Sequence, residues 1–180
     1  MSDLFMRFPQ GKGKALTLSY DDGVEQDAQL LSIMNAHGLK GTFNLNTGCY
    51  AEEGTVYPAG QIHRRMPESK VIELFVNSGQ EIAVHGLTHP WLEQLPEPMM
   101  MRELIADREN LERQFGTIVR GMAYPFGAFD DRVVEGVRRA GLVYARTTIA
   151  SHGFKIPADW LRLEATCHHN DPALRELTQR

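Results

Sequence analysis

Hydrophobic and polar positions along the chain change period repeatedly, which predicts alternating strands and helices. Residues 14–20 and 41–47 alternate with the period of two that is typical of strands, and residues 81–84, 118–124, 143–147 and 160–166 are also predicted to be strands. Apolar residues recur every three or four positions, as on one face of a helix, over residues 27–37, 68–77, 98–115, 130–140 and 172–179. Because these elements alternate with short connections, the pattern predicts an α/β fold with parallel strands. The number of units favours a distorted, incomplete (β/α) barrel over a doubly wound sheet.

The longest predicted helix, at 98–115, has an apolar face and a charged face. Its predicted core positions are Met101, Leu104, Ile105 and Leu111. Its charged positions, interpreted as a solvated surface, are Arg102, Glu103, Asp107, Arg108 and Glu109. This helix is therefore expected to bury its apolar face in the core and to expose its charged face to solvent.

Two adjacent acidic residues, Asp21 and Asp22, follow the first predicted strand. In parallel α/β folds the carboxyl ends of the strands carry the chemistry, so this position favours a functional role. Taken alone, the stretch Asp21-Asp22-Gly23 would more simply be a turn that caps the next helix. The choice depends on what the other strands deliver to the same edge.

The third predicted strand delivers a pair of histidines, in the stretch His85-Gly86-Leu87-Thr88-His89-Pro90. Two imidazoles four residues apart can converge on one ion, and Asp22 would add a carboxylate. Two nitrogens and one carboxylate suit zinc, with cobalt or manganese as alternatives, and leave a position open for water. Because adjacent residues point in different directions, Asp21 is free to act as the general base on that water.

Composition and charge exclude several classes of function. The chain has 180 residues, 42% of them hydrophobic, which predicts a single domain with a sizeable core. The net charge of −4 and the absence of a basic run argue against nucleic acid as a partner. No stretch predicts a signal peptide, a membrane span or a nucleotide-binding loop, so we expect a cytoplasmic protein without a membrane partner.

These motifs resemble those of the polysaccharide deacetylases of the NodB-homology type, carbohydrate esterase family four. Ser19-Tyr20-Asp21-Asp22-Gly23 is similar to the family's Thr-Phe-Asp-Asp-Gly, in which the first Asp is the base and the second binds metal. His85-Gly86-Leu87-Thr88-His89-Pro90 is similar to its His-Ser/Thr-x-x-His, with Gly86 in place of the usual hydroxyl residue. The resemblance implies the roles of base for Asp21 and metal ligand for Asp22, His85 and His89.

The later motifs of the family match less completely. Ala123-Tyr124-Pro125-Phe126-Gly127 is similar to Arg-Pro-Pro-Tyr/Phe-Gly, which places Phe126 and its neighbour Tyr124 on the oxyanion side of the substrate. Ala123 occupies the position of the arginine that orients the base, and Arg120 would replace it only if the strand bends. Asp159-Trp160 resembles the fourth motif, which makes Trp160 either a wall of the groove or simple packing.

The resemblance implies a metal-dependent hydrolase that removes acetyl groups from an N- or O-acetylated carbohydrate, with metal-bound water as nucleophile. Two alternatives stay open. One is a hydrolase of another non-peptide C–N bond, acting on a small amide. The other is a deacetylase-like domain that has lost turnover and serves in binding. Assembly into a homo-oligomer is also left open by the sequence.

One irregular segment, 48–67, is too long for a simple connection and is expected to border the substrate. Tyr50, Tyr57 and Trp91 would stack on sugar rings or else belong to the core. His63, within the segment, is expected to be exposed and not a ligand.

The family's last motif, Leu-x-His, supplies the histidine that protonates the leaving group, and no such motif follows residue 171. His168 is the best-placed late histidine, but His168-His169-Asn170-Asp171 more simply predicts a polar turn before the last helix. We therefore expect a single deacetylase-like domain over residues 1–180 that is shortened at its C-terminus.

Overall fold

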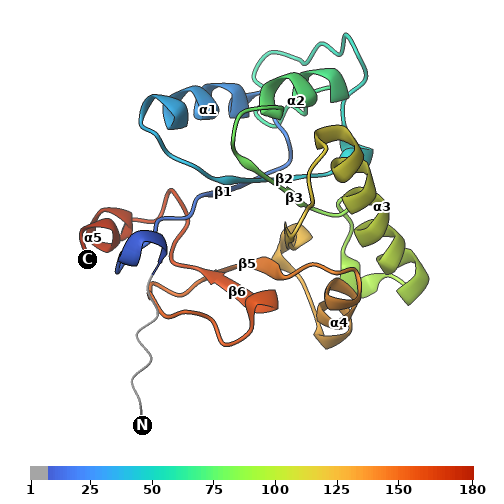
Figure 1. Ribbon diagram of the computed structural model, residues 1–180. Helices are drawn as coiled ribbons and strands as arrows, with labels where there is room; N and C mark the ends of the chain where they lie inside the picture. Colours follow the sequence, from blue (N-terminus) through green and yellow to red (C-terminus); the bar gives the residue numbers. More distant parts are fainter. Residues whose placement is uncertain (1–7) are drawn as a thin grey trace.

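Six parallel strands form one curved sheet, and their order in the sheet follows their order in the chain (Figure 1). This arrangement comes from a computed structural model that describes residues 8–180. The strands are β1 (Ser19–Asp21), β2 (Thr42–Leu45), β3 (Glu81–Val84), β4 (Gly121–Ala123), β5 (Tyr144–Ala150) and β6 (Leu163–Ala165). The predicted incomplete (β/α) barrel is therefore confirmed. The expectation of no signal peptide depends on residues 1–7, which lie outside the described part.

The α-helices of residues 8–180 are α1 (Gln26–Ala36), α2 (Glu68–Phe75), α3 (Glu97–Phe115), α4 (Asp131–Arg139) and α5 (Leu174–Gln179). Helices α1 to α4 connect successive strands from β1 to β5 and lie outside the curved sheet, and α5 follows the last strand, β6 (Figure 1). Each of the five matches a predicted helix to within three residues at either end. Within residues 8–180, no helix is both long and apolar enough to cross a lipid bilayer.

The two strands at the ends of the sheet, β1 and β6, are shorter than the sequence pattern predicts, and so is the inner strand β4, which covers only part of the predicted range 118–124. The pattern indicated a strand from residue 14, but β1 begins at Ser19 and residues 14–17 are exposed. The pattern also indicated a strand from Trp160, but Trp160–Arg162 is a short 3₁₀ helix before β6. Both strands lie at an edge of the sheet and pair on one side only, so fewer hydrogen bonds hold their ends extended.

The buried face of α3 differs from the predicted one. Leu104 and Leu111 are fully buried as expected, but Ile105 is 39% exposed. Asp107, predicted to be solvated, has no exposed surface, because it packs where the sheet supplies donors for its carboxylate. The Thr47 backbone N–H donates to Asp107 Oδ1 at 2.8 Å, and the His85 backbone N–H donates to Oδ2 at 3.2 Å. Helix α3 therefore joins the ends of β2 and β3.

Truncation of the core at α3 is expected to destabilise the fold. Leu104→Ala removes a fully buried side chain, so the free energy of unfolding should fall by about 2–5 kcal/mol. Met99→Ala on the same helix is the matched control, because Met99 is 56% exposed and its loss should cost far less. Urea unfolding followed by circular dichroism measures both. Equal losses for the two variants would contradict this assignment of the core.

Candidate active site

The chemically active residues of the first two motifs meet at one edge of the sheet. Asp21 is the last residue of β1 and Asp22 follows it, whereas His85 follows β3 and His89 lies in the next turn. Because the strands are parallel, their carboxyl ends share this edge. One ligand atom from each of Asp22, His85 and His89 lies within 4.8 Å of the other two. The structure thus brings the three predicted ligands together.

The geometry of these three residues fits a divalent cation. Asp22 Oδ1 lies 3.9 Å from Nε2 of His85 and 3.9 Å from Nε2 of His89. Ligand bonds of about 2.1 Å around tetrahedral zinc would separate ligand atoms by roughly 3.4 Å. His85 Nδ1 lies 2.8 Å from the Ala123 carbonyl oxygen, which only accepts, so Nδ1 carries the proton. Its Nε2 is therefore the ring nitrogen that faces the carboxylate of Asp22.

Electrostatics at the site favour the protonation states that ligands need. Burial raises the pKa of the Asp22 carboxyl, but Arg65, His85, His63 and His89 together hold it below its usual value. Burial, reinforced by the neighbouring His85, lowers the pKa of the His89 imidazole. An ionised carboxylate and a neutral imidazole are the forms that coordinate a cation.

Asp21 is held beside the ligand group by Arg146, an arginine that the sequence motifs did not point to. Arg146 Nη2 donates to both carboxylate oxygens of Asp21, at 2.5 and 2.6 Å, and Arg146 Nε donates to Ser19 Oγ at 2.9 Å. The Asn44 amide also donates to Asp21 Oδ1, at 2.9 Å. Asp21 Oδ2 remains 3.9 Å from His85 Nε2. The carboxylate is thus oriented beside the ligands.

Arg146 lies next to Ala123, the residue at the position where the third motif of the family has an arginine. It lies on β5, and the register of β4 and β5 pairs it directly with Ala123. Arg120, the substitute considered from sequence, has an exposed side chain. The missing guanidinium is therefore supplied from the neighbouring strand. The available signal was a charged residue in the middle of an otherwise uncharged predicted strand, 143–147.

Three residues of the site have a backbone conformation that L-amino acids rarely adopt. The φ angles are +85° at Asp22, +55° at His89 and +57° at Phe126. Such left-handed conformations cost about 1–3 kcal/mol each and collect at functional sites. The surrounding contacts must therefore hold these residues in place.

Residues 85–90, called here the histidine loop, are hydrogen-bonded to Glu103 on α3. Glu103 was predicted to lie on the solvated face of this helix. Its carboxylate accepts hydrogen bonds from the Thr88 backbone N–H at 2.7 Å and from Thr88 Oγ1 at 2.9 Å. Its backbone carbonyl accepts from the Leu87 N–H at 3.1 Å. Gly86, where the family has a hydroxyl residue, has a φ of +77°, and a Cβ there would come within 3.2 Å of Pro125.

Two exposed aromatic rings border the ligand group. Trp91 stacks on Phe126 with ring centroids 4.3 Å apart, and Phe126 meets the His89 ring edge-on at 4.4 Å. Trp91 is 44% exposed and Phe126 is 50% exposed. Tyr50 and Tyr57 are instead tied to the protein, since their hydroxyl groups donate to Gln114 Oε1 and to the Arg65 carbonyl. Of the three candidate stacking residues, Trp91 alone is thus shown beside the ligands.

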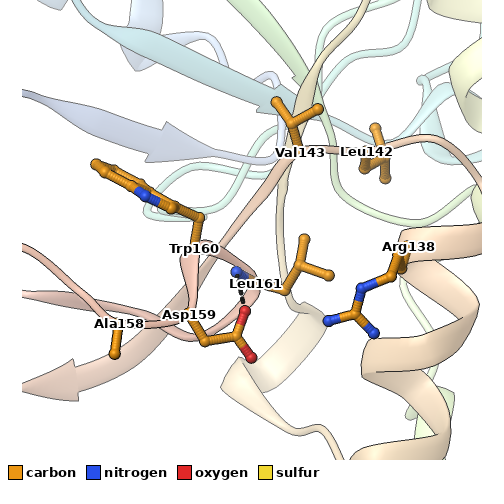
Figure 2. Close-up of a pocket in the computed structure, with 7 residues that line it drawn as sticks. All are labelled: Arg138, Leu142, Val143, Ala158, Asp159, Trp160 and Leu161. Carbon is orange, nitrogen blue, oxygen red and sulfur yellow. Dashed lines mark hydrogen bonds between the residues drawn. The ribbon is translucent and has the colours of Figure 1, made fainter.

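The structure does not bring Tyr124 or Trp160 to this group. The Tyr124 side chain is buried, its hydroxyl donates to the Leu161 carbonyl at 2.8 Å, and burial raises its pKa. Trp160 precedes β6 and lines a pocket with Arg138 and Val143, near the start of β5 (Figure 2). Phe126 is therefore the one residue of this predicted set that borders the site.

Two further histidines that the sequence pointed to, His63 and His168, lie in different parts of the structure. His63 is exposed, as expected, yet its Nε2 lies 3.0 Å from Asp22 Oδ2. His168 Nδ1 pairs with Asn170, and Asp171 Oδ1 accepts from the Ala173 N–H at 2.8 Å just before α5. His168 thus belongs to the polar turn that the sequence predicted.

Comparisons with known structures agree with this fold. PplD, a deacetylase from Streptococcus pyogenes, matches with a TM-score of 0.76 and 21% identity, over 96% of this chain and 72% of PplD. BC0361, a polysaccharide deacetylase from Bacillus cereus, matches with a TM-score of 0.74 and 21% identity, over 93% of this chain and 52% of its own. No curated protein sequence gives a significant match.

A similar fold does not by itself establish activity. BA3943 from Bacillus anthracis, described as a CE4 family pseudoenzyme, matches with a TM-score of 0.59 and 23% identity, over 73% of this chain and 43% of its own. The sequence model of the polysaccharide deacetylase family matches residues 9–145, which include every residue of the ligand group together with Asp21. The chain therefore belongs to the polysaccharide deacetylase family.

Proposed function

We propose that the protein is a metal-dependent hydrolase that removes acetyl groups from an N- or O-acetylated carbohydrate. The observation that carries this proposal is the pairing of Asp21 with Arg146 directly beside Asp22, His85 and His89. A carboxylate that is not needed as a ligand, yet is fixed next to the ligands, is placed to accept a proton. Family membership supports the acetyl substrate, and the aromatic wall of Trp91 and Phe126 suits a sugar ring.

Each residue of the site would contribute one part of the chemistry. Asp22, His85 and His89 would hold a divalent cation, which when bound makes a water more acidic and polarises a carbonyl. Asp21 would accept the proton of the attacking water, with Arg146 holding its carboxylate in place. The backbone N–H of Phe126 would donate to the oxygen that becomes negative in the transition state.

The test measures hydrolysis of an aryl acetate and of acetylated chito-oligosaccharide, before and after treatment with a chelator. Turnover of both substrates that stops with the chelator and returns with added zinc, cobalt or manganese supports the proposal. Hydrolysis of cyclic ureides or formyl amides in place of the sugar would favour the other C–N hydrolase. No turnover of any substrate in the presence of metal would favour a domain that binds without catalysis.

Loss of Arg146 is expected to lower the rate without releasing metal. Arg146→Met removes both contacts to Asp21, and a misplaced catalytic group can cost about 10²-fold, so kcat should fall by that order while KM and metal content stay unchanged. Arg146→Lys should restore part of the rate. Arg120→Met is the matched control, because Arg120 is exposed on the adjacent segment. If Arg120→Met lowers kcat as much as Arg146→Met, the orienting role of Arg146 is wrong.

A further inference from the structure

The long loop after β2 returns across the acidic motif and pairs with it. Arg65 and Val24 form an antiparallel bridge. The Glu25 N–H donates to the Arg64 carbonyl at 2.8 Å, and the Met66 N–H donates to the Gly23 carbonyl at 2.9 Å. This alternation directs Arg65 toward Asp22 and Arg64 toward Glu25 on the outside. The loop thus delivers one arginine to the ligand group and leaves its neighbour at the surface.

Arg65 contacts Asp22 at two points. Its Nη2 donates to Asp22 Oδ1 at 2.8 Å, and its Nη1 donates to the Asp22 backbone carbonyl at 3.0 Å. The Arg65 side chain is only 17% exposed. His63, from the same loop, lies 3.0 Å from the other carboxylate oxygen, Oδ2. Side chain and backbone of Asp22 are therefore fixed relative to each other by one guanidinium.

Asn46 extends this contact to the histidine loop. Arg65 Nη1 also donates to Asn46 Oδ1 at 2.9 Å, and Asn46 is completely buried after β2. The Asn46 amide donates to the His85 carbonyl at 2.5 Å and to the Gly86 carbonyl at 2.7 Å. One hydrogen-bonded network therefore joins the ends of β1, β2 and β3, which carry two of the three ligands. A buried polar network that is fully paired is rigid.

We propose that Arg65 is a positioning residue that holds Asp22 in its metal-binding geometry, with Asn46 linking it to the His85 segment. The inference rests on the metal site of the proposed function. Asp22 has a left-handed φ of +85°, a conformation that contacts with the rest of the protein must stabilise. Arg65 binds both ends of this strained residue, so the carboxylate is oriented before any cation arrives.

The charge of Arg65 and its positioning role would change the metal affinity in opposite directions, so a measurement of affinity distinguishes them. A positive guanidinium 2.8 Å from a ligand oxygen repels a cation, so by charge alone its removal should tighten metal binding. Positioning predicts weaker binding, because partners that orient a ligand are typically worth about 10–100-fold in metal affinity.

The experiment titrates the metal-free full chain with zinc and with cobalt and compares dissociation constants. Arg65→Met should weaken binding by about 10–100-fold, and Arg65→Lys should fall between it and the original protein. Arg64→Met is the matched control: it removes the same charge one residue away, where the partner is the partly exposed Glu25, and should leave the affinity unchanged. Unchanged or tighter binding by Arg65→Met would overturn the inference.

Two further measurements separate this inference from the proposed function. If the original chain binds neither metal, the metal site itself is wrong; if it binds and Arg65→Met binds equally well, only the inference fails. In an Asp22→Ala background, Arg65→Met should have no further effect on residual binding, since its target is gone. Thermal unfolding of the metal-free proteins checks folding, and if Arg65→Met does not fold, Arg65→Lys decides, with unchanged affinity counting against the inference.

Discussion

Asp22→Ala and His89→Ala are each expected to lose the divalent cation and, with it, all metal-dependent hydrolysis. Each change removes one of three groups whose ligand atoms lie within 4.8 Å of one another. Because outer partners of metal ligands are already worth about 10–100-fold in affinity, loss of a direct ligand should weaken binding by more than about 100-fold. Metal content after dialysis, measured by elemental analysis, is the direct readout.

A matched histidine change guards against a general effect of substitution. His37→Ala removes an exposed imidazole at the end of α1 and should keep one equivalent of metal and full activity. If Asp22→Ala and His89→Ala still carry one equivalent, the ligand assignment is wrong. If His37→Ala also loses metal, the readout reflects folding, which circular dichroism of the three variants would reveal.

Asp21→Asn should show the opposite signature at the adjacent position, with metal retained and the rate lost. The amide keeps an oxygen that accepts from Arg146, so the local structure should persist. It has no basic oxygen for a proton, and general base catalysis typically contributes about 10²–10⁴-fold, so kcat should fall by that factor. Steady-state kinetics at saturating metal, together with metal content, measure the two properties separately.

The contrast between the two neighbouring aspartates is the sharpest check of their roles. Asp22→Asn and Asp21→Asn change the same chemical group at consecutive positions, so differences in size or charge do not explain a difference between them. Equal loss of metal from both would make Asp21 a ligand. Full activity of Asp21→Asn would end its assignment as the base.

Much of the site follows from the sequence because it depends on local pattern. Strand periodicity places Asp21 at the end of β1 and His85 directly after β3, and parallel strands bring such ends to one edge. His89 follows within the same short motif. The positions of these residues can be predicted without knowing which strands pair or in which register. The periodicity of α3 was less informative, because it predicted that Asp107, which is fully buried, would lie in solvent.

Only the tertiary structure assigns the residues that support this site, because their partners are distant in the chain. Arg146 reaches Asp21 across 125 positions, from a strand that is not its neighbour in the sheet. Arg65, which forms an ion pair with Asp22, lies in a loop whose sequence has no regular period. Trp91 follows β3 and stacks on Phe126, which follows β4. Periodicity reports which face of an element is buried, but it does not report what lies opposite that face. The sequence by itself predicts that Asp21, Asp22, His85 and His89 lie at one edge of the sheet, whereas the strand register and the path of the long loop decide which side chains contact them.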